Sequence, residues 1–182
     1  MKAIIHTQYG APEVLQHAEV PKQVTARDEV LVKIFATTVN RTDCGFRKPE
    51  YLMVYLIAGL FKPKNKILGT EFAGVVEAVG AGVTKFNIGD NVFGLRTYKF
   101  GTHAEYVCVK QNGSIATKPH NMNFQEAAAV CDGLMLAINY IRKIDFSKPV
   151  KLLINGASGS IGTAAVQLAK YYGAQIHAVA NT

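Results

Sequence analysis

A glycine-rich segment close to residue 160 combines residue types at a spacing that could bind a dinucleotide. Residues 155–162 have the sequence Asn-Gly-Ala-Ser-Gly-Ser-Ile-Gly. An apolar run at 150–154 precedes them, and a helix-like stretch at 163–172 and a second apolar run at 176–180 follow. A glycine-rich first turn in such a strand–helix–strand unit is typical of dinucleotide-binding proteins. The spacing therefore predicts a pyrophosphate site, with a glycine-rich turn that binds no ligand as the alternative.

The glycines and the helix that follows them have separate expected roles. Gly159 leaves room for backbone N–H groups to approach a pyrophosphate, and Gly162 lets the helix pack closely against the strand. The N-terminus of the helix adds partial positive charge. Ala157 stands where the pattern usually has its first glycine. The candidate cofactor-binding residues of the turn are Ala157, Ser158, Gly159, Ser160, Ile161 and Gly162.

One further position bears on the choice of cofactor. Enzymes that use NAD usually place Asp or Glu about 20 residues beyond the glycine turn, where the carboxylate holds the ribose 2′-hydroxyl. Asn181 occupies this position. A neutral amide does not repel the 2′-phosphate of NADPH, so the sequence favours NADPH over NADH and makes Asn181 a candidate cofactor contact. Basic residues that would contact the 2′-phosphate are expected beyond Thr182.

Short alternating apolar runs dominate the first 118 residues and predict a β-rich domain with a partly open, barrel-like sheet. At Asn123 the apolar period changes, and Asn123 and Glu126 have the spacing of a capping box that opens a helix toward Arg142. The fold class is therefore α/β. One domain is expected at 1–118, and a connecting helix with the first βαβ unit of a doubly wound sheet at 119–182. The expected strands are Lys2–His6, Glu29–Thr37, Glu71–Val79, Asn91–Leu95 and Ala104–Lys110.

Several segments resemble, in sequence order, the medium-chain dehydrogenase/reductase superfamily. They are Met1–Ala3, the GTEFAGVVEAVG run at 69–80, the Gly-Asp-Asn-Val turn at 89–92, the GTHAEY run at 101–106 and the glycine turn. The resemblance implies a GroES-like, partly open β-barrel followed by a Rossmann domain that binds a nicotinamide cofactor. Members of the superfamily are nearly twice as long as this chain. We therefore expect it to be the N-terminal part of a longer protein, truncated within the Rossmann domain and inactive alone.

Two of the superfamily's zinc ligands have no counterpart here. Zinc alcohol dehydrogenases use Cys, His and usually Cys at the catalytic metal, and the resembling positions are Asn40, Thr70 and Cys131. The four-cysteine structural zinc lobe has no counterpart between Gly89 and Gly101. One thiol cannot hold zinc, which takes about four ligands. The chain therefore resembles the zinc-independent branch, the quinone oxidoreductases and related enone reductases, and no metal site is expected.

The resemblance implies a catalytic role for Asn40. In quinone oxidoreductases an asparagine at this position faces the nicotinamide and the substrate. Without a metal, negative charge on a substrate oxygen must be stabilised by hydrogen bonds and by the charge of the nicotinamide. A turn residue that bonds the local backbone is the alternative for Asn40. Glu71 is expected either to be functional or to form an ion pair inside the β domain, and Asp43 is expected to be structural.

The function favoured by the sequence is that of an NADPH-dependent, zinc-free oxidoreductase. Hydride would pass to a quinone or an α,β-unsaturated carbonyl as the small-molecule substrate. An enoyl-thioester reductase is the alternative enzyme. A binding or assembly module without catalytic activity is the alternative outside enzymes.

Composition and charge limit the partners and the location. The formal net charge is +7, but most lysines are dispersed and no RNA-binding motif accompanies them, so nucleic acid is not expected as a main partner. Three scattered cysteines favour reduced thiols in the cytoplasm over disulfide bonds. The apolar strands at 150–154 and 176–180 are typical of a sheet covered on both faces. Their incomplete cover within this chain predicts a homo-oligomer.

Residues 47–66 look like an insertion relative to compact members of the family. Apolar residues dominate 51–61, and Lys62, Lys64 and Lys66 follow. This run is too short to span a membrane, which takes about 20 residues. Three interpretations are open: a helix packed on the β domain or on a partner subunit, a lid over a bulky apolar substrate, and an interfacial membrane contact through 51–66.

Overall fold

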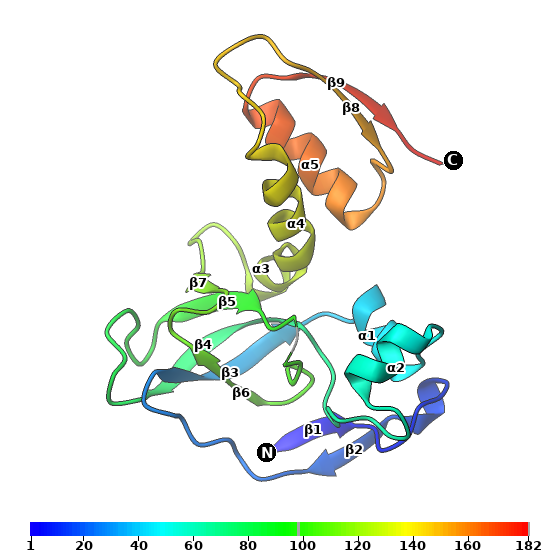
Figure 1. The fold of residues 1–182 in the computed structure, drawn as a ribbon. Helices are drawn as coiled ribbons and strands as arrows, with labels where there is room; N and C mark the ends of the chain where they lie inside the picture. Colours follow the sequence, from blue (N-terminus) through cyan, green and yellow to red (C-terminus); the bar gives the residue numbers. More distant parts are fainter. Residues whose placement is uncertain (98, 182) are drawn as a thin grey trace. The chain divides into compact units, whose positions relative to one another are not determined.

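The structure of the chain is a computed structural model that describes residues 1–97 and 99–181 (Figure 1). It divides into two compact units, Met1–Ala128 and a second unit that begins at Ala129. The first unit is built mainly from antiparallel strands, and the second contains two parallel strands with helices. The fold is therefore α/β, as the sequence predicts.

Five antiparallel strands form the main sheet of the first unit, in the order β6-β3-β4-β5-β7. β-Branched and aromatic side chains suit the half-buried surface of such a sheet. Val30 and Val32 of β3 meet Phe72 and Val76 of β4 in a core where none of the four is more than 1% exposed. The strands are β3 (Glu29–Thr37), β4 (Glu71–Val79), β5 (Asn91–Leu95), β6 (Tyr106–Lys110) and β7 (Ile115–Thr117).

A second pair of antiparallel strands extends the first unit. β1 (Lys2–Ile5) pairs with β2 (Gln16–Glu19), and the short 3-10 helix Pro12–Val14 lies between them. Isolated bridges from Ala3 to Ala104 and from Ile5 to Ile67 join β1 to the rest of the unit. The sheet is thus curled into the partly open barrel that the strand spacing predicts.

The strand predictions hold for three of the five expected strands. β3, β4 and β5 have the expected bounds, whereas the strand expected at 104–110 begins at Tyr106 and the one expected at 2–6 ends at Ile5. β2 and β7, which have four and three residues, were not expected from the sequence. Strands this short show too little alternation to be distinguished from loops.

Two short helices follow β3 in the first unit. α1 (Arg41–Arg47) begins directly after Asn40, and α2 (Leu52–Ala58) lies within the segment that looks like an insertion. Within the described residues, 1–97 and 99–181, no helix has the length and apolar character needed to cross a membrane.

The second unit contains the expected βαβ unit. Its two strands are parallel, and one helix connects them. A further helix packs closely on the connecting one because Gly133 has no side chain: a Cβ there would lie 2.4 Å from Ser160 Oγ. The elements are α4 (Cys131–Ile141), β8 (Lys151–Asn155), α5 (Ser160–Tyr171) and β9 (Gln175–Val179).

The helix expected from Asn123 toward Arg142 is in fact two helices. α3 (Phe124–Ala129) opens with the predicted capping box. The Asn123 N–H donates to Glu126 Oε2 at 2.9 Å, and the Glu126 N–H donates to Asn123 Oδ1 at 2.8 Å. Val130 then separates α3 from α4.

The first unit extends ten residues beyond 118, where the sequence analysis placed the domain boundary. Ala127 and Ala128 are buried against β4. The ring of Phe124 stacks on that of Phe35 in β3, with ring centroids 5.0 Å apart. Because these apolar side chains pack on the main sheet, most of α3 belongs to the first unit.

One face of the parallel pair in the second unit is open among the described residues. Leu153 of β8 is 74% exposed, and Val179 of β9 is 46% exposed. Apolar side chains on an open sheet face favour association with another surface. The homo-oligomer predicted from the sequence stays a prediction.

Candidate functional site

Asn40 directly precedes α1 and caps it. Its Oδ1 accepts a hydrogen bond from the Asp43 N–H at 3.1 Å, and its own N–H donates to Asp43 Oδ2 at 3.0 Å. This reciprocal capping box satisfies amides that the first helical turn leaves without partners. The local backbone role considered for Asn40 is therefore present, and it uses only one end of the side-chain amide.

The other end of the amide reaches residues that are about 30 positions away in the sequence. Nδ2 of Asn40 donates to Thr70 Oγ1 at 2.8 Å and to Glu71 Oε2 at 3.1 Å. Thr38 Oγ1 also donates to Glu71 Oε2. Thr70 and Glu71 are 2% and 3% exposed. We call these four residues, Thr38, Asn40, Thr70 and Glu71, the Asn40 cluster; its hydrogen bonds provide the Glu71 carboxyl group with two donors, which a buried acidic group needs.

Asp43 holds the cluster in place. It is 2% exposed, and its Oδ1 accepts a hydrogen bond from the Gly69 N–H at 2.9 Å. Its Oδ2 lies 3.9 Å from Nε2 of His103, which donates to the carbonyl of Thr38 at 2.8 Å. Burial raises the pKa of the Asp43 carboxyl group above its usual range. Asp43 thus joins α1 to the turn before Thr70, which is a structural role.

The positions that resemble the first two zinc ligands lie together, because Asn40 and Thr70 are hydrogen bonded. Neither an amide nor a hydroxyl is among the usual zinc ligands in proteins. Cys131, at the third position, is buried at the start of α4 in the second unit. In the part of the chain that the structure describes, no three His, Cys, Asp or Glu residues are grouped to hold a metal ion.

The glycine turn connects β8 to α5, as predicted. Gly156 has φ of +77°, a conformation that favours glycine. The N–H groups of Gly156 and Ala157 both donate to the carbonyl of Val179 at 2.9 Å, which ties the turn to the end of β9. Asn181, which is exposed, follows β9 by two residues. The turn and Asn181 therefore lie at the same edge of the sheet, beyond the carboxyl ends of both strands, where dinucleotides bind in such folds.

Gly159 and Gly162 differ in what surrounds them. A Cβ at Gly162 would lie 2.1 Å from the carbonyl oxygen of Gly156 and 2.7 Å from Cα of Ala157, so no side chain fits there. A Cβ at Gly159 would have only the Gly156 oxygen nearby, at 3.5 Å. Gly162 is thus needed for the close approach of helix and turn, whereas Gly159 borders open space.

The glycine turn fits a pyrophosphate. Gly159 is the N-cap of α5, and no side chain caps this helix. The first amides of an uncapped helix remain available to an anion, and the helix dipole favours negative charge there. The side chains of Ser158 and Ser160 are exposed beside these amides. This donor set matches the chemistry of a dinucleotide phosphate.

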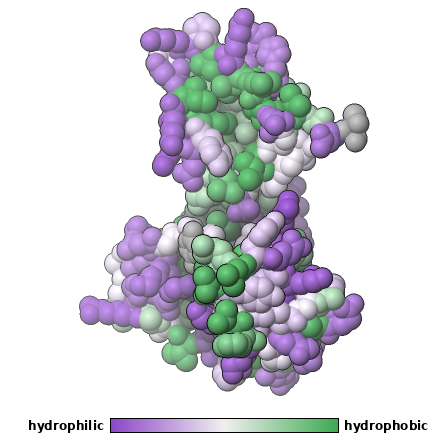
Figure 2. All heavy atoms as spheres, turned by 45° about the vertical axis from the view of Figure 1, so that its right-hand side comes forward, coloured by the Kyte–Doolittle hydropathy of each residue, from purple (hydrophilic) through white to green (hydrophobic). Residues whose placement is uncertain are grey.

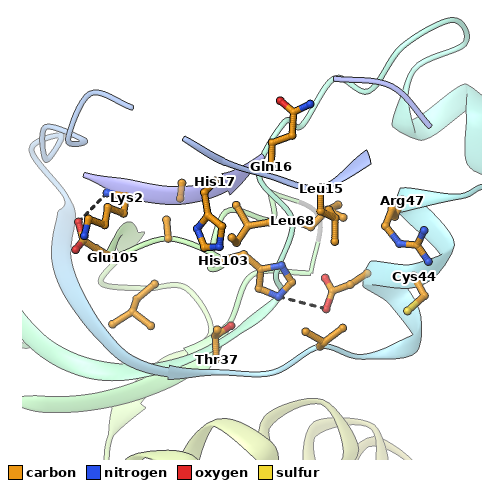
Figure 3. A pocket seen from close by; sticks show the side chains of 16 residues that line it. Lys2, Leu15, Gln16, His17, Thr37, Cys44, Arg47, Leu68, His103 and Glu105 are labelled. Carbon is orange, nitrogen blue, oxygen red and sulfur yellow. Dashed lines mark hydrogen bonds and ion pairs between the residues drawn. The ribbon is translucent and has the colours of Figure 1, made fainter. Parts of the chain in front are cut away.

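A cavity of about 660 Å³ in the first unit is lined in part by α1. Figure 3 shows the ring of His103 in the middle of its lining, with Cys44 and Arg47 on one side and Lys2 and Glu105 on the other. Asn40 is not among the lining residues. The sequence indicates no role for His103 or Thr38, because their contacts with Asp43 and Glu71 join residues far apart in the chain.

The family of the chain follows from its similarity to known proteins. Residues 26–120 match the family model described as the alcohol dehydrogenase GroES-like domain. The chain therefore belongs to this family. Its structural neighbours place it in the medium-chain dehydrogenase/reductase superfamily, which confirms the resemblance seen in the sequence.

Similar proteins cover the whole chain. The quinone oxidoreductase of Homo sapiens is 32% identical over 187 residues, which cover 100% of this chain and 53% of that protein. The chloroplastic NADPH-dependent alkenal/one oxidoreductase of Arabidopsis thaliana is 30% identical over 192 residues, which cover 100% of this chain and 48% of that protein. The chain thus spans about half the length of the curated relatives it matches.

Solved structures show the same fold. The quinone oxidoreductase from Coxiella burnetii superposes with a TM-score of 0.86 at 28% identity, over 100% of this chain and 57% of that one. The CurK enoyl reductase superposes with a TM-score of 0.85 at 25% identity, over 99% of this chain and 54% of that one. Both the GroES-like unit and the βαβ unit therefore have counterparts in known oxidoreductases.

Proposed function

We propose that this protein acts as an NADPH-dependent, zinc-independent oxidoreductase on quinones or α,β-unsaturated carbonyls. The observation that carries the proposal is the hydrogen bond between Asn40 and Thr70, at the positions that resemble two zinc ligands. Similarity to a quinone oxidoreductase and to an NADPH-dependent alkenal/one oxidoreductase supports the same reaction class.

Residues of the second unit would hold the cofactor. NADPH, when bound, supplies a hydride from its nicotinamide ring. The amides of Ser160 and Ile161 would bind its pyrophosphate, with Gly159 leaving the space that the phosphates need. The neutral side chain of Asn181 would lie near the ribose and tolerate a 2′-phosphate. The exposed edge of the turn supports this assignment.

Asn40 would face the nicotinamide and the substrate. Its side chain is half-buried, and three hydrogen bonds hold it in one orientation. Both N–H bonds of its amide already have acceptors, in Thr70 and Glu71. A hydrogen bond from Asn40 to a substrate oxygen therefore requires one of these two bonds to be shared. A polar group oriented in advance in this way stabilises developing charge without reorganisation.

The direct test is NADPH oxidation by the purified full-length protein with a panel of acceptors: a quinone, an alkenal and an enoyl-CoA. Turnover of the quinone or the alkenal is the expected result. Absence of turnover with every acceptor, with either NADPH or NADH, contradicts the proposal. The variant Asn40→Ser retains a capping oxygen and loses the amide. It should raise the activation free energy of the reaction by more than it lowers the free energy of unfolding.

Two alternative functions can be distinguished by the same turnover assay together with a titration of NADPH. An enoyl-thioester reductase is favoured by the similarity to the CurK enoyl reductase, and preferential turnover of the enoyl-CoA would support it. A non-catalytic binding module is supported if NADPH titration shows no affinity. Measurable NADPH affinity without turnover would leave the cofactor site correct and the acceptor class wrong.

We also propose that the protein is a homo-oligomer and that it is located in the cytoplasm. The open face around Leu153 supports a homo-oligomer. Cys44 is an exposed free thiol, which would persist in a reducing compartment such as the cytoplasm.

A further inference from the structure

The outer face of α2 and the residues just after it form an apolar surface. Seven large apolar side chains there are between 51% and 91% exposed. In Figure 2, which brings forward the side of the first unit on which α2 lies in Figure 1, hydrophobic side chains gather among hydrophilic ones. We call this set the α2 surface; it consists of Tyr51, Leu52, Met53, Leu56, Ile57, Leu60 and Phe61.

The inner side of α2 holds the helix on the first unit. Ala58 is buried, and the ring of Tyr55 contacts that of Tyr9 edge-on, with centroids 5.1 Å apart. The Tyr9 hydroxyl donates to the carbonyl of Gly59 at 2.5 Å. A helix packed on the β domain, one interpretation of 47–66, therefore accounts for one side only. The exposed side chains are held outward by a fixed element.

Positive charge borders the α2 surface. Lys62, Lys64 and Lys66 are exposed, and residues 51–66 contain no Asp or Glu. Within 1–97 and 99–181, none of the three lysines forms an ion pair with a carboxylate. The apolar side chains are thus followed directly by unpaired cations.

Two of these lysines also line a basic hollow. Its volume is about 320 Å³, and Lys64, Lys66, Arg96 and Lys99 contribute to its wall. No acidic side chain lines it among the residues that the structure describes. Desolvation by burial lowers the pKa of the Arg96 guanidinium, and the charge of Glu29 offsets only part of this effect. A hollow lined by four cations fits a phosphate group.

We propose that the α2 surface docks on the surface of an anionic lipid bilayer, with the lysines and the basic hollow on lipid phosphates. Apolar side chains beside basic ones are typical of interfacial membrane contacts, which reach about 5–10 Å into the boundary between headgroups and acyl chains. The charges favour a bilayer over a second copy of this chain. A two-fold contact through the same face would bring the lysines of the two copies together. This docking does not depend on the proposed reaction.

The test measures co-sedimentation of the protein with vesicles of phosphatidylcholine alone and of phosphatidylcholine with phosphatidylglycerol. Binding to the anionic vesicles only, weakened by salt, is expected. Lys62→Gln/Lys64→Gln/Lys66→Gln should weaken binding roughly 5-fold per lysine. Leu56→Ser/Ile57→Ser should weaken it by at least about 10-fold.

Matched controls alter exposed residues elsewhere by the same amounts. Lys85→Gln/Lys143→Gln/Lys148→Gln removes the same charge, and Val24→Ser/Ile88→Ser removes comparably exposed apolar side chains. Both should bind like the unaltered protein, with unchanged melting temperatures in all four variants. Lack of binding to anionic vesicles, or equal losses in variants and controls, overturns the proposal. A dimer that dissociates in Leu56→Ser/Ile57→Ser, without vesicle binding, assigns the face to a second copy.

Discussion

The side-chain amide of Asn40 donates a hydrogen bond to the hydroxyl of Thr70 across 2.8 Å, and the same side chain caps α1 through its oxygen. One residue therefore joins the start of a helix to the segment that enters β4. The two functions can be separated by substitution, because capping needs only an oxygen whereas the link to β4 needs the N–H donors.

We expect Asn40→Ala to destabilise the protein by about 1 kcal/mol more than Asn40→Ser does, because serine caps helices and alanine does not. Both variants lose the donors to Thr70 and Glu71. Chemical denaturation of the two variants and the unaltered protein measures the difference. Equal stabilities of the serine and alanine variants would show that the capping oxygen contributes nothing.

Substitution by alanine should destabilise the protein at one glycine of the cofactor turn and not at the other. Gly162→Ala places a Cβ 2.1 Å from a backbone oxygen and should destabilise the second unit by about 1–3 kcal/mol. Gly159→Ala meets nothing closer than 3.5 Å and should leave the melting temperature nearly unchanged.

A bulkier residue at Gly159 should reduce NADPH affinity while the fold is retained. Gly159→Val places a branched side chain beside the first amides of α5, where the pyrophosphate is proposed to bind. Titration calorimetry and thermal unfolding of the same sample separate the two effects. If the melting temperature fell in proportion to the affinity, Gly159 would be structural.

Acid should destabilise the protein through His6. This side chain is 1% exposed, its Nδ1 bonds the carbonyl of Lys66 at 3.2 Å, and its Nε2 has no partner among the described residues. Burial lowers its pKa below the usual value of 6.5. The folded state therefore binds the proton less readily than the unfolded state. The free energy of unfolding therefore decreases as the pH falls from 6.5 toward the pKa of His6 in the folded state, by at most about 1.4 kcal/mol per pH unit.

The variant His6→Asn keeps a donor in place of Nδ1 and does not titrate. It should be less stable at neutral pH because it leaves a cavity, but its free energy of unfolding should fall less between pH 7 and pH 5. His120→Gln, which alters an exposed histidine, is the control and should keep the slope of the unaltered protein. Parallel pH profiles for all three proteins would exclude His6 as the cause.

Metal analysis of the purified protein should find no stoichiometric zinc. Asn40 and Thr70 occupy the positions that resemble two zinc ligands, and they are hydrogen bonded to each other. Their amide and hydroxyl groups replace the imidazole and thiolate that zinc prefers. Mass spectrometry of the metal content, before and after chelation, provides the measurement. One zinc ion per chain that survives chelation, and that is lost in Cys131→Ser, would refute the zinc-independent assignment.

Elements whose signals lie within a few residues of one another could be predicted from the sequence alone. The bounds of β3, β4 and β5, the capping box at Asn123 and the turn from Gly156 to Gly162 are of this kind. Backbone propensity, side-chain alternation and glycine conformation depend on neighbouring residues, so the sequence alone is enough to predict them. The choice of Asn40 as a site residue came from resemblance, and its catalytic role stays a prediction.

The tertiary structure decided what depends on distant partners. Periodicity shows that a strand has an apolar face, but not which element covers it. The packing of residues 124–128 on the main sheet therefore could not be predicted from the sequence. The sequence also left open whether the apolar side chains of α2 are packed inward or exposed. The pairing of β3 with β4 is what brings Thr38 and Asn40 beside Thr70 and Glu71. Hydrogen bonds across about 30 residues follow from strand order and register, which emerge only when the whole sheet packs its core.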